Sequence, residues 1–190
     1  MAIRFVDMRP KSYCDAASPA GCGQVASEPV DATGGANPSA SIADVNYELF
    51  MGEALAEAQL AASRGERPVA AVAVVDEAMV ARAHDRVEAA NDPTAHAVVV
   101  ALREAARRLG RVRLADATIF TTHEPCAMCV GALLESDVEA LVYAMPNTRD
   151  GAAGTVIQLA QHQALPRRIK VVSGIRRDEA EALLAAAPSV

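Results

Sequence analysis

Two short stretches decide the fold of this chain: Asn91-Asp92-Pro93-Thr94-Ala95-His96-Ala97-Val98 and Thr121-Thr122-His123-Glu124-Pro125-Cys126-Ala127-Met128-Cys129. Together they offer one imidazole, from His96, and two thiolates, from Cys126 and Cys129. Zinc prefers nitrogen and sulfur donors in a tetrahedral arrangement, and a site with three protein ligands leaves the fourth position for water or substrate. The two stretches therefore predict a catalytic metal site.

The spacing of these residues predicts that two helices begin at the metal. Thr94 follows a proline and is a good N-cap, so His96 is expected in the first turn of a helix. Pro125 opens a second helix, with Cys126 in its first turn and Cys129 three residues later on the same face. The unpaired N–H groups and positive dipole end of each helix favour thiolate over thiol. We expect both helix N-termini to converge on one ion.

Other interpretations of the same residues were weighed. A lone C-x-x-C also occurs in redox pairs and as half of a structural zinc ribbon, and a lone histidine is commonly a core or surface residue. The sequence holds no second C-x-x-C or histidine pair that would complete a four-ligand structural site. Cys14 and Cys22 lie in a tail of different composition, where a reversible disulfide, a metal site and free thiols are all open. The combined pattern favours zinc on His96, Cys126 and Cys129.

Four motifs carry a wider resemblance: Arg67-Pro68-Val69-Ala70-Ala71-Val72, Asp92-Pro93-Thr94-Ala95-His96-Ala97, Glu124-Pro125-Cys126-Ala127-Met128-Cys129 and Gly151-Ala152-Ala153-Gly154. With them the chain resembles the zinc-dependent cytidine and deoxycytidylate deaminase superfamily, whose signature is H-x-E followed by P-C-x-x-C. It looks most similar to bacterial tRNA adenosine deaminases and their guanine and cytosine deaminase relatives, over about residues 45–184. The resemblance implies a cytidine deaminase-like α/β fold: a three-layer α/β/α sandwich around a mixed sheet of about five strands, with Zn²⁺ as cofactor.

The resemblance fails at one position that matters for mechanism. Members of the family carry Glu two residues after the metal-binding histidine, whereas this chain has Val98. In the family, that Glu takes a proton from the zinc-bound water and delivers protons to the ring nitrogen and the leaving amine. Positioned acid or base groups contribute about 10²–10⁴-fold each to a rate. Because valine carries no proton, the sequence predicts a strongly impaired deaminase.

The resemblance also implies a substrate-binding set of Asp85, Ala97 and Pro125. The family usually has Asn at the position of Asp85, where it contacts the substrate. An aspartate there is our candidate for a relocated proton carrier that replaces the missing Glu. The alternative is an aspartate that caps its loop and pairs with Arg86 or Arg82.

Further residues next to the metal ligands are interpreted as supporting groups. His123 and Glu124 directly precede Pro125 in the second stretch, so we expect them to fix the loop or to orient the cysteines.

The secondary-structure pattern is that of alternating helices and strands in one zinc domain, residues 41–187. Helices are expected over residues 41–65, 95–109, 126–136, 155–163 and 178–187, and strands over residues 69–75, 79–83, 117–122, 140–144 and 169–173. Ser41 is the expected N-cap of the first helix, and Asp76-Glu77 the turn of a hairpin. Residues 1–40 are rich in Gly, Pro, Ser and Ala and are predicted to be a flexible extension.

Composition limits the partners and the compartment. No stretch reaches the length of a membrane span, no signal-peptide core is seen near the N-terminus, and four cysteines suit a reducing cytoplasm. The net charge of −6 disfavours a strong electrostatic footprint for tRNA. The end of the chain, residues 183–190, also lacks the basic, aromatic tail expected of a family member that acts on tRNA. A small nucleobase or nucleoside-like substrate is therefore favoured over tRNA.

Three functional hypotheses follow from the sequence. The first is a zinc hydrolase that deaminates a purine- or pyrimidine-like base or nucleoside with impaired activity. The second is a catalytically silent partner or regulatory subunit, since the non-catalytic subunit of the eukaryotic tRNA adenosine deaminase similarly keeps the ligands and has valine in place of Glu. The third is a tRNA adenosine deaminase variant in which Val98 is an engineered or sequencing change. The superfamily commonly assembles as dimers, so the resemblance implies a homodimer, with a heterodimer as the alternative.

Overall fold

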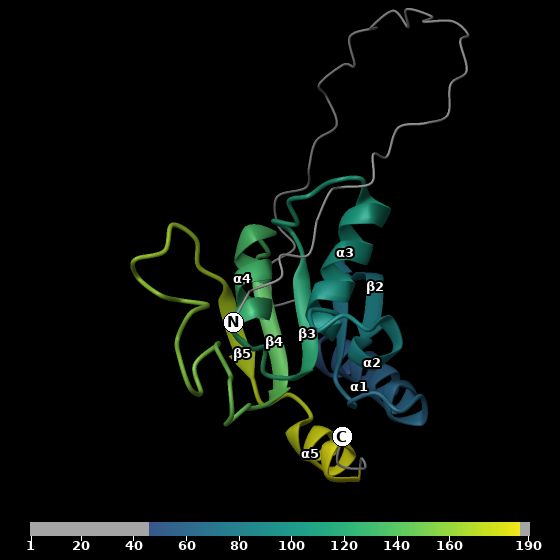
Figure 1. Cartoon of the computed structure of the whole chain (residues 1–190). Helices are drawn as coiled ribbons and strands as arrows, with labels where there is room; N and C mark the ends of the chain where they lie inside the picture. The colour runs from purple at the N-terminus through teal and green to yellow at the C-terminus, as the bar shows by residue number, and fades with distance from the viewer. Residues whose placement is uncertain (1–45, 187–190) are drawn as a thin grey trace, which may run out of the picture. The chain divides into compact units, whose positions relative to one another are not determined.

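The computed structural model describes residues 46–186. Within this range the elements follow one another as α1 (Tyr47–Ser63), β1 (Ala70–Val75), β2 (Ala78–His84), α2 (Val87–Ala90), α3 (Ala97–Leu109), β3 (Thr118–His123), α4 (Ala127–Glu135), β4 (Ala140–Met145), β5 (Lys170–Ser173) and α5 (Arg177–Ala186) (Figure 1). The predicted extension over residues 1–40, including Cys14 and Cys22, lies outside the described range. In that range no helix is both long and apolar enough to cross a membrane.

One mixed sheet runs through the domain in the order β2-β1-β3-β4-β5. β1 pairs antiparallel with β2 and β3, whereas β3, β4 and β5 are parallel to one another. All six residues of β1 are buried, as the continuous Ala and Val run predicts for a strand covered on both faces. Asp76 and Glu77 have φ angles of 48° and 59°, the left-handed values that a tight two-residue hairpin turn requires. The predicted hairpin is confirmed.

Helices cover both faces of the sheet, and the alternation of side chains along each strand explains how. Val72, Phe120 and Val142 point to the face covered by α1 and α5, where they belong to one core cluster with Phe50 and Ala180. Their neighbours in sequence belong to a second cluster on the opposite face, together with residues of α3 and α4. The predicted mixed sheet of five strands between helical layers is therefore confirmed.

Three predicted helix starts differ from those observed. Helix α1 begins at Tyr47, not at Ser41, because Asn46 is the N-cap and its Oδ1 accepts the N–H of Leu49 at 3.0 Å. His96 and Cys126 are not in the first turns of α3 and α4 but are their N-cap residues, with extended backbone geometry. In α3 and α4 the metal-binding residue is itself the N-cap, whereas we expected the helix to start one or two residues earlier.

The helix predicted over residues 155–163 is wrong. Residues 154–169 form turns and a short bridge between Ala153 and Gln158. The cause is competition for backbone donors: the N–H groups of Val156 and Ile157 both bond to the carbonyl oxygen of Gly151. The N–H group of Thr155 bonds to the carboxylate of Glu124. Further on, the N–H groups of Leu159 and Ala160, which a helix would bond to the carbonyl oxygens of Thr155 and Val156, bond to that of Ala152.

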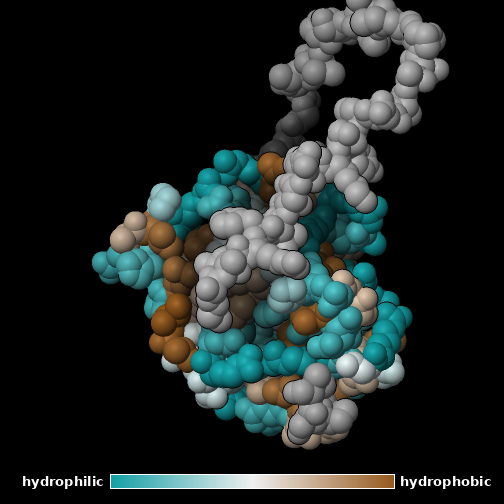
Figure 2. All heavy atoms as spheres, in the orientation of Figure 1, coloured by the Kyte–Doolittle hydropathy of each residue, from teal (hydrophilic) through white to brown (hydrophobic). Residues whose placement is uncertain are grey.

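Hydrophobic side chains are exposed at several places on the surface of the described residues. Figure 2 shows hydrophobic residues gathered at the left of the view, where Figure 1 draws the segment between β4 and β5. Val156 and Ile157 in that segment are 50% and 49% exposed, and Met128 of α4 is 38% exposed. Exposed apolar side chains that lie next to one another, as Val156 and Ile157 do in sequence, are typical of a protein contact surface.

Candidate metal centre and its cavity

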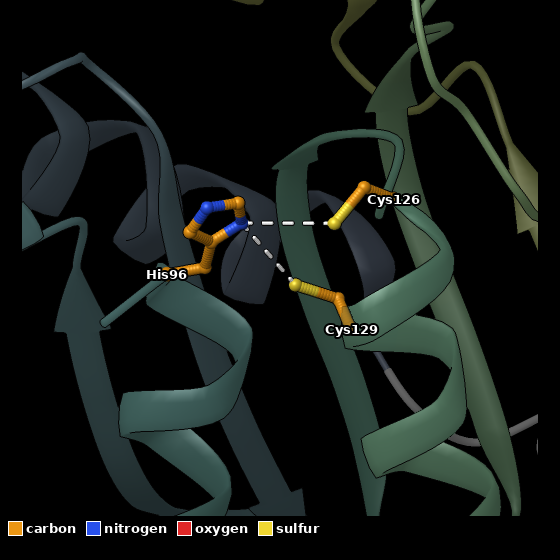
Figure 3. Close-up of side chains that lie close together, drawn as sticks. All are labelled: His96, Cys126 and Cys129. Carbon is orange, nitrogen blue, oxygen red and sulfur yellow. Dashed lines mark hydrogen bonds between the residues drawn. The ribbon is translucent and has the colours of Figure 1, made fainter. Parts of the chain in front are cut away.

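Three side chains meet between the N-termini of α3 and α4. The Nδ1 atom of His96 lies 3.7 Å from Sγ of Cys126 and 3.6 Å from Sγ of Cys129 (Figure 3). Zn–S bonds of about 2.3 Å and Zn–N bonds of about 2.0 Å at tetrahedral angles require an N···S separation of about 3.5 Å. The three residues predicted from the sequence are thus brought together at the spacing of a zinc site, and they could hold that ion with one position left open.

The two thiols form a hydrogen-bonded pair whose pKa values shift in opposite directions. The Cys129 thiol donates a hydrogen bond to the Cys126 sulfur, which with the backbone N–H groups of Cys129 and Met128 lowers the pKa of Cys126 to about 5. The same hydrogen bond, followed by burial, raises the pKa of Cys129. A metal ion bound by both sulfurs would replace this shared proton and neutralise the two thiolates.

A small cavity with a volume of about 30 Å³ opens over these three residues. Its walls are formed by Arg67, Val69, Asp85, His96, Ala97, Val98, Thr121, His123, Glu124, Pro125, Cys126, Cys129, Asn147 and Asp150. The residues that the sequence assigns to substrate, Asp85, Ala97 and Pro125, all line it. Val98 lines it too and is only 3% exposed, so an apolar side chain occupies the family's Glu position.

Asp85 faces the cavity and is fixed by a helix end. It follows β2, is 3% exposed, and its Oδ1 accepts the N–H of Ala97, the first residue of α3, at 2.7 Å. Burial raises the pKa of Asp85 despite the hydrogen bond from Ala97 and the nearby positive charges of His96 and Arg67. Its Oδ2 has no hydrogen-bond partner among the described residues. One carboxylate oxygen is thereby used for structure, and the other is available to a ligand.

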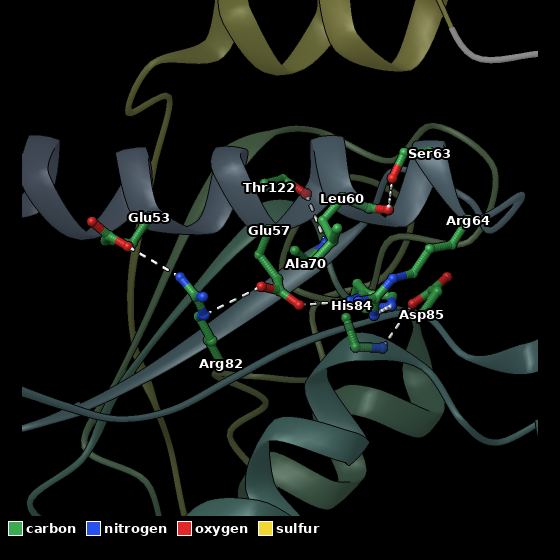
Figure 4. Close-up of polar contacts among 11 residues, drawn as sticks. Glu53, Glu57, Leu60, Ser63, Arg64, Ala70, Arg82, His84, Asp85 and Thr122 are labelled. Atoms are coloured by element: carbon green, nitrogen blue, oxygen red, sulfur yellow. Dashed lines mark hydrogen bonds and ion pairs between the residues drawn. The ribbon is translucent and has the colours of Figure 1, made fainter.

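The described contacts include no ion pair between Asp85 and Arg86 or Arg82, which was the alternative for Asp85. Arg82 lies on the other side of β2 and pairs with Glu57 at 3.3 Å (Figure 4). Glu57 also contacts the buried His84, with 2.6 Å between Oε1 and Nδ1. Side chains at successive positions of a strand point to opposite faces, so His84 and Asp85 diverge. The contacts of Glu57 with Arg82 and His84 hold the end of β2 on one face of the sheet. Asp85 points to the opposite face, where it lines the cavity with the metal-binding triad.

Glu124 fixes the loop after β4, as predicted for a supporting group. Its carboxylate is 1% exposed and accepts three backbone N–H groups, those of Asn147 at 3.0 Å, Ala153 at 2.9 Å and Thr155 at 3.0 Å. Gly151 lies so close that a Cβ there would be 2.5 Å from Oε2 of Glu124. The loop therefore winds tightly around one buried carboxylate and forms a wall of the cavity.

Glu124→Gln is expected to lower the free energy of unfolding by about 1.5–3 kcal/mol, since an amide donor replaces an acceptor of buried N–H groups. Denaturant unfolding of the purified protein measures this change. Glu135→Gln, at an exposed position in the same part of the chain, is the control and should change stability by less than about 0.5 kcal/mol. Equal stability of the two variants would show that Glu124 does not hold the loop.

The sequence did not single out several cavity residues. Arg67, Asn147 and Asp150 line the cavity, and His123 faces the cavity where we expected a supporting role. Burial, followed by the charge of Arg67, lowers the pKa of His123, so its imidazole is neutral at pH 7. Burial alone would raise the pKa of Asp150, but hydrogen bonds from Asn147 and the guanidinium of Arg149 lower it overall. The only signal for Arg67 was its place directly before a buried strand.

Comparison with known proteins agrees with this geometry. Residues 44–145 match the family model of the cytidine and deoxycytidylate deaminase zinc-binding region. The tRNA-specific adenosine deaminase of Bacillus subtilis (strain 168) is 39% identical over 139 residues, which are 73% of this chain and 86% of the relative. The tRNA-specific adenosine deaminase of Aquifex aeolicus is 37% identical over 65% of this chain and 82% of its own length.

Solved structures show the same arrangement of elements. One, from a study of A-to-I editing by tRNA:A34 deaminases, superposes with a TM-score of 0.69 at 34% identity and covers 72% of this chain and 99% of its own. A guanine deaminase from Nitrosomonas europaea superposes with a TM-score of 0.61 at 27% identity, over 74% of this chain and 84% of its own.

Proposed function

Because the chain belongs to the cytidine and deoxycytidylate deaminase zinc-binding family, we propose that it binds a purine- or pyrimidine-like base at a zinc centre of His96, Cys126 and Cys129 and deaminates it slowly. Zinc, when bound, supplies the Lewis acidity that makes water a nucleophile at neutral pH. The chain's own residues must then position the base and move protons. The side chain of Val98 cannot transfer protons, and this single observation supports the proposal of impaired activity.

The remaining carboxylates of the cavity wall were compared as proton carriers. Both oxygens of Glu124 accept backbone N–H groups. Those of Asp150 are used by Asn147 and Arg149. Asp85 alone among these three keeps an oxygen without a partner in the described residues. We therefore propose that Asp85 contacts the exocyclic amine of the base and carries the residual proton transfer.

Asp85→Asn tests this assignment, because the amide oxygen can still accept the N–H of Ala97 while the proton-carrying oxygen is lost. We expect the residual ammonia release of the native chain to fall by about 10²-fold. The assay screens adenine, guanine, cytosine and their nucleosides. Because the Bacillus subtilis relative is tRNA-specific, it also includes an RNA hairpin with adenosine in its loop. Release that Asp85→Asn leaves unchanged would remove Asp85 from the mechanism.

A second candidate is a non-catalytic subunit of a deaminase dimer. Two observations support it: Val98 packs into the core cluster with α3 and α4, and the apolar side chains of Met128, Val156 and Ile157 are exposed. We propose that this apolar surface is covered in a homodimer. A native chain that is dimeric and zinc-loaded but releases no ammonia from any of these substrates would favour the silent subunit over the slow enzyme.

A further inference from the structure

Arg67 is a half-buried arginine on the wall of the cavity, just before β1. Only two other described arginines are half-buried, Arg167 and Arg176. Arg167 pairs with Asp137 at 3.2 Å, and Arg176 pairs with Glu179 at 2.6 Å. The guanidinium of Arg67, in contrast, has no hydrogen-bond or ion-pair partner within residues 46–186. A half-buried cation in this state lacks the compensation that such groups usually have.

His123 adds a second unpartnered polar group to the same cavity. It ends β3, is half-buried, and its imidazole makes no hydrogen bond to any described residue. The charge of Arg67 acts on His123 and also on Asp85 and Asp150. Arg67 therefore lies near the side chains that surround the metal-binding triad, and its charge interacts with groups that line the cavity.

No acidic group of the wall forms an ion pair or a hydrogen bond with Arg67 among the described residues, although the charge of Arg67 acts on Asp85 and Asp150. Asp85 bonds the first N–H of α3 at 2.7 Å, and Glu124 bonds three backbone N–H groups. The two oxygens of Asp150 are taken by Asn147 and by Arg149, the latter at 3.4 Å. Glu124 and Asp150 thus have both oxygens bonded to the protein's own donors, whereas Asp85 keeps Oδ2 free for a ligand within the described part of the chain. The side-chain donors left for a ligand are those of Arg67 and His123.

We propose that Arg67 and His123 form an anion-binding wall beside the metal centre, so that the preferred ligand is a base that carries a phosphate or carboxylate group. The inference rests on the proposed function, which places a base in this cavity, and it adds the chemical class of that base. A guanidinium presents two parallel N–H donors that match two oxygens of a phosphate or carboxylate. A neutral imidazole adds one further N–H donor.

Binding to the zinc-loaded full chain tests the proposal without relying on turnover. Calorimetry would compare adenosine with AMP, cytidine with CMP, and cytosine with 5-carboxycytosine. We expect at least one charged ligand to bind about 10- to 100-fold more tightly than its neutral counterpart, as for a charge-assisted hydrogen-bond pair. Preference for the monophosphates would identify a phosphate, and preference for 5-carboxycytosine a carboxylate.

Arg67→Met keeps the length of the side chain and removes the charge. It should abolish the preference while the neutral ligands bind as before, and His123→Phe should reduce it. Arg86→Met is the matched control, because Arg86 is exposed and does not line the cavity. Equal binding of charged and neutral ligands by the native chain, or a preference that survives in Arg67→Met, would overturn the anion site alone. Failure of every ligand, neutral ones included, would overturn the proposed function as well.

Discussion

Val98→Glu is expected to raise the rate of ammonia release from the preferred base by at least about 10²-fold, the lower range for a positioned acid or base. Val98 lines the cavity next to the metal-binding triad and lies on the second residue of α3. A glutamate there would reach into the same space from a rigid helix, close to the open position of the metal. It would supply the proton transfer that the native chain lacks.

Val98→Gln is the control for this gain, since it matches the glutamate in size and polarity but carries no titrating proton. Zinc content and circular dichroism of both variants should equal those of the native chain, which excludes loss of the site or of the fold. Under these conditions the steady-state rate should rise in the glutamate variant only. A native chain that is already as fast as Val98→Glu would show that another group performs the proton transfer in full.

His96→Ala is expected to lower the melting temperature of the zinc-loaded protein by roughly 8–16 °C. An ion present at 1,000 times its dissociation constant stabilises the folded state by about 4 kcal/mol, and each kcal/mol corresponds to roughly 2–4 °C for a chain of this size. The three ligands join the start of α3 to the start of α4, so the ion cross-links two elements of the same helical layer.

Differential scanning calorimetry with and without a chelator measures this effect. The chelator should lower the melting temperature of the native chain to that of His96→Ala and leave the variant unchanged. His162→Ala, at an exposed histidine away from the cavity, should behave as the native chain does. A native melting temperature that does not respond to the chelator would mean that no metal supports the fold.

The sequence predicted the parts of the fold that depend on short-range pattern. The all-apolar run before Asp76 favoured a strand covered on both faces, and the metal triad followed from donor chemistry, spacing and the deaminase motif. The zinc ligands were found because their residue types are restrictive. The predicted starts of α3 and α4 were one or two residues too early because His96 and Cys126 are themselves the N-cap residues. Neither His nor Cys is among the residues that capping propensities favour.

What the sequence could not provide depended on contacts between distant segments. The helix over residues 155–163 was expected from the resemblance, but the N–H groups of Leu159 and Ala160 bond to the carbonyl oxygen of Ala152. Glu124, about 30 residues earlier, also accepts the N–H groups of Ala153 and Thr155. Likewise, Arg67 and His123 are ordinary residues in the sequence. They become functional candidates only because β1 and β3 are neighbours in the sheet and bring both to one cavity.

The zinc content of the purified native chain, measured beside that of His96→Ala, tests the central claim most directly. A site with three protein ligands predicts about one zinc ion per native chain and almost none in the variant. A native chain without zinc, or a variant that keeps as much zinc as the native chain, would contradict a metal centre built from His96, Cys126 and Cys129.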